Sequence, residues 1–206
     1  MKEFNFKLEP GRKLYNNREY VETFPLISVI VPFYNSEKFI EQTIKSILNQ
    51  TFPCYEILII DDGSTNKMAL EKLEQIKELD KRIKVFHKQN EGLATTRDYG
   101  ASKSNEHARY LMFIDDDDLI EPTFLECGFW TLETNKDAAW AYSDSLGFGS
   151  IEYTWNKYFS SEKMKKENDL ISAALVRKTD FFLVNGYNLK EKAVNEDWNF
   201  WLKLLS

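Results

Sequence analysis

Residues 110–122 read YLMFIDDDDLIEP, an apolar run followed at once by the carboxylates Asp115, Asp116, Asp117 and Asp118. The apolar run is typical of a buried strand, whereas adjacent aspartates repel one another unless a positive charge lies among them. A turn needs only one or two such residues. Carboxylate oxygens are the ligands that magnesium and manganese prefer. The stretch therefore predicts a strand that ends at a divalent-cation site.

Similar apolar runs recur along the chain and alternate with segments of helical period. Strands are predicted over residues 27–34, 55–60, 82–87, 108–114 and 138–143. Helices are predicted after Ser36, which can cap the first of them, over residues 66–80, and after Gly92. Alternation at this spacing predicts an α/β fold of the Rossmann-like kind, a mostly parallel central sheet with helices on both faces.

Length and composition predict how the chain is divided. With 206 residues, of which 43% are apolar and 15% aromatic, the chain can bury one sizeable core, so we expect a single domain. The polar residues 1–25 are predicted to form an N-terminal extension, and residues 26–206 the domain itself. Aromatic residues scattered among Lys and Ser over 145–168 predict a loop or lid there.

Charge and cysteine content argue against several classes of protein. A net charge of −6 argues against a nucleic-acid partner, since such surfaces are usually basic. Cys54 and Cys127 lack metal-ligand spacing and are typical of buried residues in a reducing compartment. The sequence has neither a signal-peptide core nor an apolar run of the roughly 20 residues that cross a membrane. We therefore expect a cytoplasmic protein that is able to touch the inner face of the membrane without crossing it.

Two acidic runs, Asp61–Asp62 and Asp115–Asp118, follow predicted strands. In open α/β sheets, ligands bind at the carboxyl ends of the strands, where both runs would lie. The segment DDGSTN, residues 61–66, is also good turn and helix-cap chemistry without any ligand. The usual Gly-rich phosphate loops are missing, so a cation and Arg97 would have to neutralise a phosphate-bearing substrate. Arg97 can equally be a solvated surface residue.

Five segments together resemble the motif series of family 2 inverting glycosyltransferases of the GT-A fold. In order, they are ISVIVPFYN (27–35), QTFPCYEILIIDDGSTN (50–66), NEGLATTRDYGA (90–101), YLMFIDDDDLIEP (110–122) and NEDWNFW (195–201). The resemblance covers residues 26–206. It implies that a sugar is transferred from a nucleotide-diphosphate donor, with a UDP-sugar expected, to an acceptor hydroxyl. It also implies manganese or magnesium as cofactor.

The resemblance assigns donor-binding residues by motif position. Pro32 and Tyr34 would line the nucleobase pocket, with Tyr34 against the ring. Asp62 would accept the N3–H of uracil, where cytosine offers an acceptor; guanine also presents donors, so Asp62 alone leaves the base open. Arg97 would lie near the base or the diphosphate, and Asp115 toward the ribose or, through water, the metal.

The same resemblance divides the rest of the acidic run. Asp117 would bind the metal directly. Asp116 occupies the variable position of the motif, where replacement is expected to be mild, and Asp118 would lie behind the metal-binding residue.

The segment NEDW implies the residues that act on the acceptor. Asp197 would be the catalytic base, and Glu196 and Trp198 would shape the acceptor side. Asn195 can cap a helix whose first turn holds Glu196 and Asp197, and acidic residues are favoured there without any catalytic duty. If Asp197 is not the base, Asp144 and Glu196 are the next candidates.

The chain also departs from the family's pattern. Asp98 stands where many relatives have Asn, which is expected to add a negative charge near the diphosphate. Relatives usually continue beyond Ser206, which predicts a domain truncated on its acceptor side. By family analogy the acceptor would be a glycan or a lipid-linked glycan in cell-surface polysaccharide synthesis.

Two alternative functions remain open at this point. One is a non-catalytic or incomplete nucleotide-sugar-binding domain. The other is a sugar-nucleotide pyrophosphorylase, which needs an N-terminal Gly-rich loop with a basic residue that VPFYNSEKF, residues 31–39, does not resemble.

Overall fold

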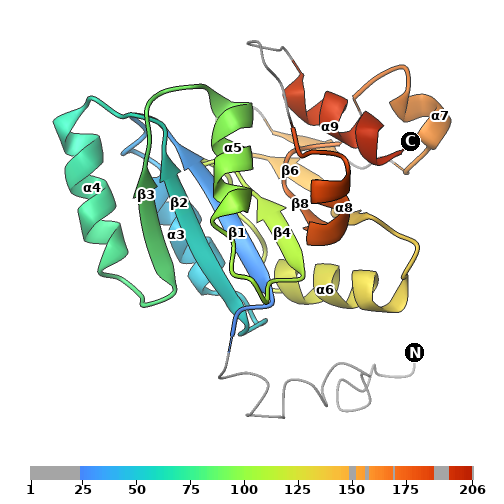
Figure 1. Cartoon of the computed structure of the whole chain (residues 1–206), viewed down its shortest axis with the longest axis horizontal. Coiled ribbons are helices and arrows are strands. Elements are labelled where there is room, and N and C mark those ends of the chain that lie inside the picture. The colour runs from blue at the N-terminus through green and yellow to red at the C-terminus, as the bar shows by residue number, and fades with distance from the viewer. Residues whose placement is uncertain (1–23, 149–151, 156–157, 169, 188–194, 206) are drawn as a thin grey trace.

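A six-stranded sheet forms the centre of the computed structural model, which describes residues 24–148, 152–155, 158–168, 170–187 and 195–205. The sheet order is β3 (Ile83–His87), β2 (Tyr55–Asp61), β1 (Ile27–Phe33), β4 (Tyr110–Phe113), β8 (Ala174–Arg177) and β5 (Trp140–Tyr142) (Figure 1). The pairs β1–β2, β1–β4 and β2–β3 are parallel, whereas β8 is antiparallel to both of its neighbours. The prediction of a mostly parallel sheet is confirmed.

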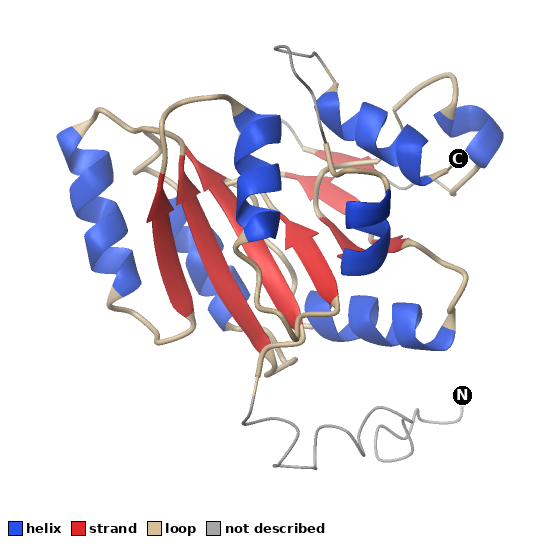
Figure 2. Ribbon diagram, viewed as in Figure 1, coloured by secondary structure: helices blue, strands red, loops and turns tan. Residues whose placement is uncertain are grey.

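Helices cover both faces of this sheet, as Figure 2 shows in blue around the red strands. One buried cluster joins the sheet to α3 (Ile40–Leu48), α4 (Lys67–Lys77) and α6 (Phe124–Thr134). The other cluster joins it to α5 (Leu93–Ser102), α7 (Ser161–Met164), α8 (Lys178–Leu183) and α9 (Glu196–Leu204). In Figure 1, α5 and α8 lie in front of the sheet and α3 behind it.

The central strands are mostly apolar because both of their faces are buried. The buried Ser28 of β1 donates to Oε1 of Glu56 in β2 at 2.7 Å, so these two polar side chains are paired. In β1, Val29 and Val31 belong to the cluster on the α3 side, and Ile30 to the cluster on the α5 side. Helix α5 packs closely on its face: a Cβ built at Gly100 would lie 2.4 Å from Cγ2 of Ile30. A glycine at this position therefore allows α5 to approach the sheet.

The strand order places a topological switch point beside β1. From β1 the chain adds β2 and then β3 on one side, and it returns to add β4 on the other side. Ligands of open α/β sheets bind in the crevice that such a reversal leaves at the carboxyl ends of the strands. Here those ends lead into Tyr34 after β1 and Asp115 after β4.

Several elements are not predicted from the sequence. These are β8, α6, α8 and the short elements within residues 145–168, namely β6 (Ser145–Gly147), β7 (Tyr153–Trp155) and α7. The prediction of a loop or lid over 145–168 is therefore wrong in part, since β6 and β7 form an antiparallel pair. The elements β6, β7, β8 and α7 have three or four residues each, which is too short to show a periodicity, so the sequence does not predict them.

Two predicted helix caps differ from the observed ones. Helix α3 begins at Ile40 with Phe39 at its N-cap, so the prediction that Ser36 caps it is wrong. The Ser36 hydroxyl instead donates to Oδ1 of Asp116, at 3.1 Å. Asn195 does occupy the N-cap position of α9, but in a left-handed conformation (φ 65°) and without a side-chain hydrogen bond to the helix. The predicted extension lies, up to residue 23, outside the described residues.

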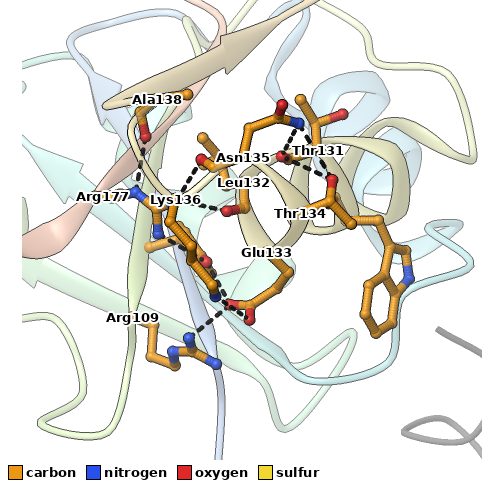
Figure 3. Close-up of polar contacts among 11 residues, drawn as sticks. Arg109, Thr131, Leu132, Glu133, Thr134, Asn135, Lys136, Ala138 and Arg177 are labelled. Atoms are coloured by element: carbon orange, nitrogen blue, oxygen red, sulfur yellow. Dashed lines mark hydrogen bonds and ion pairs between the residues drawn. The ribbon is translucent and has the colours of Figure 1, made fainter. Parts of the chain in front are cut away.

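Arg177, the last residue of β8, joins the sheet to the end of α6 (Figure 3). Its Nε donates to the carbonyl of Ala138 at 2.7 Å, and its Nη2 donates to the carbonyls of Asn135, at 3.0 Å, and Leu132. Carbonyl groups at the C-terminal end of a helix have no partner within the helix, so such donors stabilise it. Arg177 pairs in register with Tyr110, at the amino end of β4, opposite to the end that carries the aspartates.

Neither Cys54 nor Cys127 forms a disulfide within the described residues. Cys54 is buried, as predicted, whereas Cys127 is exposed, so the prediction of a buried residue is wrong for Cys127. Within the described ranges, the structure contains no helix with the length and apolar character needed to span a membrane.

Candidate active site

A cleft of about 450 Å³ opens at the carboxyl ends of β1, β2 and β4, the switch point described above. Its volume falls in the range of roughly 300–1,000 Å³ that is usual for small-molecule sites. The lining residues come from the end of β1, the start of α5 and the loops that follow β1, β2, β3 and β4: Pro32, Phe33, Tyr34, Ser36, Asp62, Asn90, Gly92, Leu93, Thr96, Asp115, Asp116 and Asp117. The structure thus brings together the predicted residues Pro32, Tyr34, Asp62, Asp115 and Asp117 in one site.

The turns after β1 and β2 are tied together by Asn35. Its side-chain Oδ1 accepts the backbone N–H groups of Thr65, at 2.9 Å, and Asn66, at 2.8 Å, while its own N–H donates to Oγ of Ser64 at 2.9 Å. These bonds fix the position of Tyr34 relative to the β2 turn. The side chain of Tyr34 is 50% exposed, so its ring is available for stacking.

Asp62 is held as a buried carboxylate on the floor of the cleft. It is only 5% exposed, and it accepts from Nζ of Lys88 at 2.6 Å and from the backbone N–H groups of Glu91, at 3.0 Å, and Gly92, at 2.9 Å. Burial by itself would raise the pKa of Asp62, but these donors, together with Thr96, lower it below its usual value. Lys88 is not among the residues predicted for this site. Its position directly after the predicted strand 82–87 is the signal that could have identified it.

Helix α3 holds the acidic loop that follows β4. The hydroxyl of Thr43 donates to the carbonyl of Asp116 at 2.9 Å, and Oγ of Ser46 accepts the N–H of Ile120 at 3.3 Å. The buried Thr43 of α3 therefore positions the loop.

The side chain of Asp116 also points into this region, because its Oδ1 accepts the Ser36 hydroxyl. Burial, followed by repulsion from Asp117 and Asp115, raises the pKa of Asp116 to about 7, although the bond from Ser36 opposes the shift. The interpretation of Asp116 only as the variable position of the motif did not foresee these contacts.

Arg97 connects the acidic loop to α9. Its side chain is 1% exposed; Nη2 donates to Oδ1 of Asp115 at 2.6 Å, and Nη1 to Oε1 of Glu196 at 3.3 Å. Burial would lower the pKa of Arg97, but its ring partner Tyr187 and the two carboxylates raise it. Asp115 also accepts the hydroxyl of Ser172, at 3.2 Å, on its other oxygen. The interpretation of Arg97 as a solvated surface residue is therefore wrong.

Of the three aspartates that line the cleft, Asp115 to Asp117, Asp117 is the exposed one. Its carboxylate makes no hydrogen bond or ion pair with another residue in the described part of the chain, so its oxygens are available to a cation. Within that part, no three His, Cys, Asp or Glu side chains are grouped so that they could hold a metal ion by themselves. The donor set fits magnesium or manganese bound through one or two carboxylates, with water and substrate phosphate as the other ligands.

The first turn of α9 carries Asp197 next to Glu196. Oδ2 of Asp197 accepts from Nδ2 of Asn168 at 3.0 Å, and its Oδ1 accepts the N–H of Trp198 at 2.8 Å. The indole N–H of Trp198 donates to the carbonyl of Met164 in α7 at 2.6 Å. Asn168 and Trp198 thus join α9 to the segment around α7, and Arg97 joins it to the cleft.

Asp98 has a structural partner that the sequence does not reveal. Its Oδ1 accepts the N–H of Tyr187 at 2.8 Å, and a Cβ built at Gly186 (φ 58°) would lie 2.4 Å from the same oxygen. The carboxylate of Asp98 therefore holds the turn that follows α8.

Comparisons with known proteins agree with this arrangement. Residues 28–183 match the sequence model of the family described as "Glycosyl transferase family 2". An uncharacterized glycosyltransferase of Rickettsia bellii is 41% identical over 136 residues, which are 61% of this chain and 19% of that protein. Another, from Methanocaldococcus jannaschii, is 29% identical over 192 residues, which are 88% of this chain and 65% of that protein. The chain thus spans less than two thirds of each relative.

Solved structures share the fold at lower sequence identity. The structure of S. aureus TarS in complex with UDP has a TM-score of 0.66 and 23% identity, covering 84% of this chain and 52% of that one. The mannosyltransferase PcManGT from Pyrobaculum calidifontis, in complex with GDP-Man and Mn²⁺, has a TM-score of 0.63 and 13% identity, covering 86% of this chain and 52% of that one. The predicted GT-A fold is confirmed.

Proposed function

Because the chain belongs to glycosyl transferase family 2, we propose that it transfers a sugar from a UDP-sugar to an acceptor hydroxyl, with a divalent cation and with inversion at the anomeric carbon. One observation carries the proposal. Tyr34 and Asp62 line the cleft at the switch point together with residues 115–117 of the acidic loop. Through Arg97, the same loop is connected to Glu196 of α9, the neighbour of Asp197 in the chain.

In this proposal the donor base lies between Tyr34 and Asp62, with Pro32 beside it. The half-exposed ring of Tyr34 stacks on the base, and ionised Asp62 accepts the N3–H of uracil. Among the proteins with a similar fold, TarS has been crystallised with UDP and with UDP-GlcNAc. These structures support a uridine nucleotide as the donor class to test first.

Asp117 would hold the cation, manganese or magnesium, through its unpaired carboxylate. When bound, the cation neutralises the charge that develops on the leaving diphosphate. Asp115, which is oriented by Arg97 and Ser172, would contact the ribose or a water molecule on the metal.

The base would be Asp197, which removes the proton of the acceptor hydroxyl as that oxygen attacks the anomeric carbon. Asn168 orients its carboxylate. Glu196 is less suited to this role because Arg97 holds it as an ion pair. Glu196 and Trp198 would instead shape the acceptor side. The acceptor class that we propose is a glycan or a lipid-linked glycan of the cell surface, reached by peripheral contact with the membrane.

The proposal is tested by measuring UDP release from a panel of UDP-sugars with manganese, with and without acceptor glycans. We expect release that a chelator abolishes and that Asp117→Ala reduces by at least about a hundredfold, because the variant loses the carboxylate that holds the cation. Asp137→Ala, at an exposed aspartate after α6, is the matched control and should keep the wild-type rate.

Two results would contradict the proposal. If the protein binds UDP but releases none from any UDP-sugar with any acceptor, it is a nucleotide-sugar-binding domain and not an enzyme. If Asp117→Ala releases UDP at the wild-type rate, a side chain other than Asp117 binds the cation.

A further inference from the structure

Lys88 follows β3 directly, and it is a buried lysine. Its side chain is 7% exposed, and lysines are almost never buried unless they are paired. Nζ donates to Oδ1 of Asp62 at 2.6 Å and to the carbonyl of Gln89 at 2.8 Å, and it forms an ion pair with Oε2 of Glu91 at 3.0 Å. An ammonium group has three protons, and three protein oxygens lie within 3.0 Å of this one, so Lys88 is satisfied by the protein itself.

These contacts determine how many acceptor positions Asp62 can offer to a ligand. A carboxylate has two oxygens, each with about two lone-pair positions. Oδ1 of Asp62 already accepts from Lys88 and from the N–H of Glu91, so it is saturated. Oδ2 accepts the N–H of Gly92. The nearby Thr96 hydroxyl donates its only proton to the carbonyl of Gly92, at 2.8 Å, so Oδ2 keeps one acceptor position. Asp62 lines the cleft, and it can therefore accept one further hydrogen bond, on Oδ2, from a bound base.

We propose that Lys88 is a specificity-determining residue that restricts Asp62 to a single acceptor and thereby selects uracil over guanine in the donor. The inference rests on the proposed function, in which Asp62 contacts the base. Uracil presents one N–H, at N3, between two carbonyl oxygens. Guanine presents two adjacent donors, N1–H and the 2-amino group, which match a carboxylate only when both of its oxygens are open. With Oδ1 saturated, one guanine donor stays unpaired in the cleft, which weakens binding.

Lys88 also has a simpler role, since it neutralises a buried carboxylate. If that were its whole role, replacing it would weaken all nucleotides by a similar factor. A specificity role changes the ratio of affinities instead. The test therefore includes two nucleoside diphosphates whose bases differ only in one hydrogen-bond donor.

The decisive comparison uses GDP and inosine diphosphate, which lacks the 2-amino group of guanine but keeps N1–H. Dissociation constants for UDP, GDP and inosine diphosphate are measured by titration calorimetry with manganese. In the wild-type protein we expect UDP to bind at least about tenfold more tightly than GDP, the scale of one lost pairing, and GDP to bind no more tightly than inosine diphosphate. This measurement needs no variant, so it does not depend on whether a Lys88 variant folds.

The variant Lys88→Met opens Oδ1 of Asp62. We expect it to narrow the preference for UDP over GDP by about tenfold and to make GDP bind more tightly than inosine diphosphate. Lys84→Met is the matched control, because Lys84 lies in β3, just before Lys88 in the chain, and pairs with Glu56 rather than with a residue of the cleft. It should keep both wild-type ratios.

The outcomes separate this inference from the proposed function. Wild-type protein that binds UDP, but binds GDP tenfold more tightly than inosine diphosphate, would overturn the role of Lys88 alone. A folded Lys88→Met protein with unchanged ratios would do the same. Wild-type protein that binds none of the three nucleotides would overturn the proposed function together with the inference.

Discussion

At the scale of single residues, the two carboxylates in the first turn of α9 differ in their partners. Glu196 pairs with the buried guanidinium of Arg97, whereas Asp197, among the described residues, accepts from the Asn168 amide and a backbone N–H. Glu196 cannot turn toward an acceptor without leaving the buried Arg97 with one carboxylate fewer, which is costly for a buried charge. This difference favours Asp197 over Glu196 as the base.

We therefore predict that Asp197→Asn lowers sugar transfer by about 10² to 10⁴, because the amide keeps the shape of the side chain but cannot accept the proton. Manganese-dependent UDP binding should stay unchanged, since Asp197 is proposed to contact the acceptor and not the donor nucleotide. Turnover with a true acceptor and calorimetry with UDP measure the two effects.

Glu126→Gln is the control for that experiment, because Glu126 is also a first-turn carboxylate, in α6. Glu126→Gln should keep the wild-type rate, which would show that removing a charge from the first turn of a helix does not by itself lower sugar transfer. Wild-type turnover by Asp197→Asn would instead show that the base lies elsewhere, and Glu196 and the exposed Asp144 would be tested next.

At the scale of elements, Arg177 is the link between β8 and the C-terminal end of α6 (Figure 3). We predict that Arg177→Met lowers the free energy of unfolding by about 2–4 kcal/mol, because three carbonyl groups lose a charged donor and water replaces it only in part. UDP binding should not change, since Arg177 lies at the opposite end of β4 from the cleft. Urea denaturation measures the loss.

The matched control is Lys136→Met, in the same polar network of Figure 3. The Lys136 side chain is 63% exposed and pairs with Glu133 on the surface, so its loss should cost less than about 0.5 kcal/mol. Equal losses for the two variants would contradict the assigned role of Arg177.

At the scale of the whole molecule, a ligand that binds only the folded state stabilises every part of it. With UDP and manganese at a hundredfold excess over Kd, we predict a gain of about 2.7 kcal/mol, or a rise in Tm of about 5–11 °C for a domain of this size. CDP should give a far smaller rise, because cytosine offers an acceptor to Asp62. Equal shifts with UDP and CDP, in a thermal-shift assay, would contradict the contact between Asp62 and the base.

The sequence by itself determined the α/β class, the parallel strands β1 to β4 and the acidic runs at their carboxyl ends. These features depend on local periodicity and on the rule that parallel strands end at one edge of the sheet. The candidate residues Tyr34, Asp62, Asp115 and Asp117 could therefore be placed in one site before any coordinates were known.

Only the tertiary structure decided which partners these residues have. Arg97 reaches Glu196 across 99 positions of the chain, and Lys88 reaches Asp62 across 26. The sequence does not predict the antiparallel strand β8. Ser172, just before this strand, donates to Asp115, and Arg177, at its end, donates to carbonyl groups at the end of α6. No local pattern encodes such contacts, because they depend on how separate elements pack. The same packing determines which carboxylate oxygens remain open to a ligand.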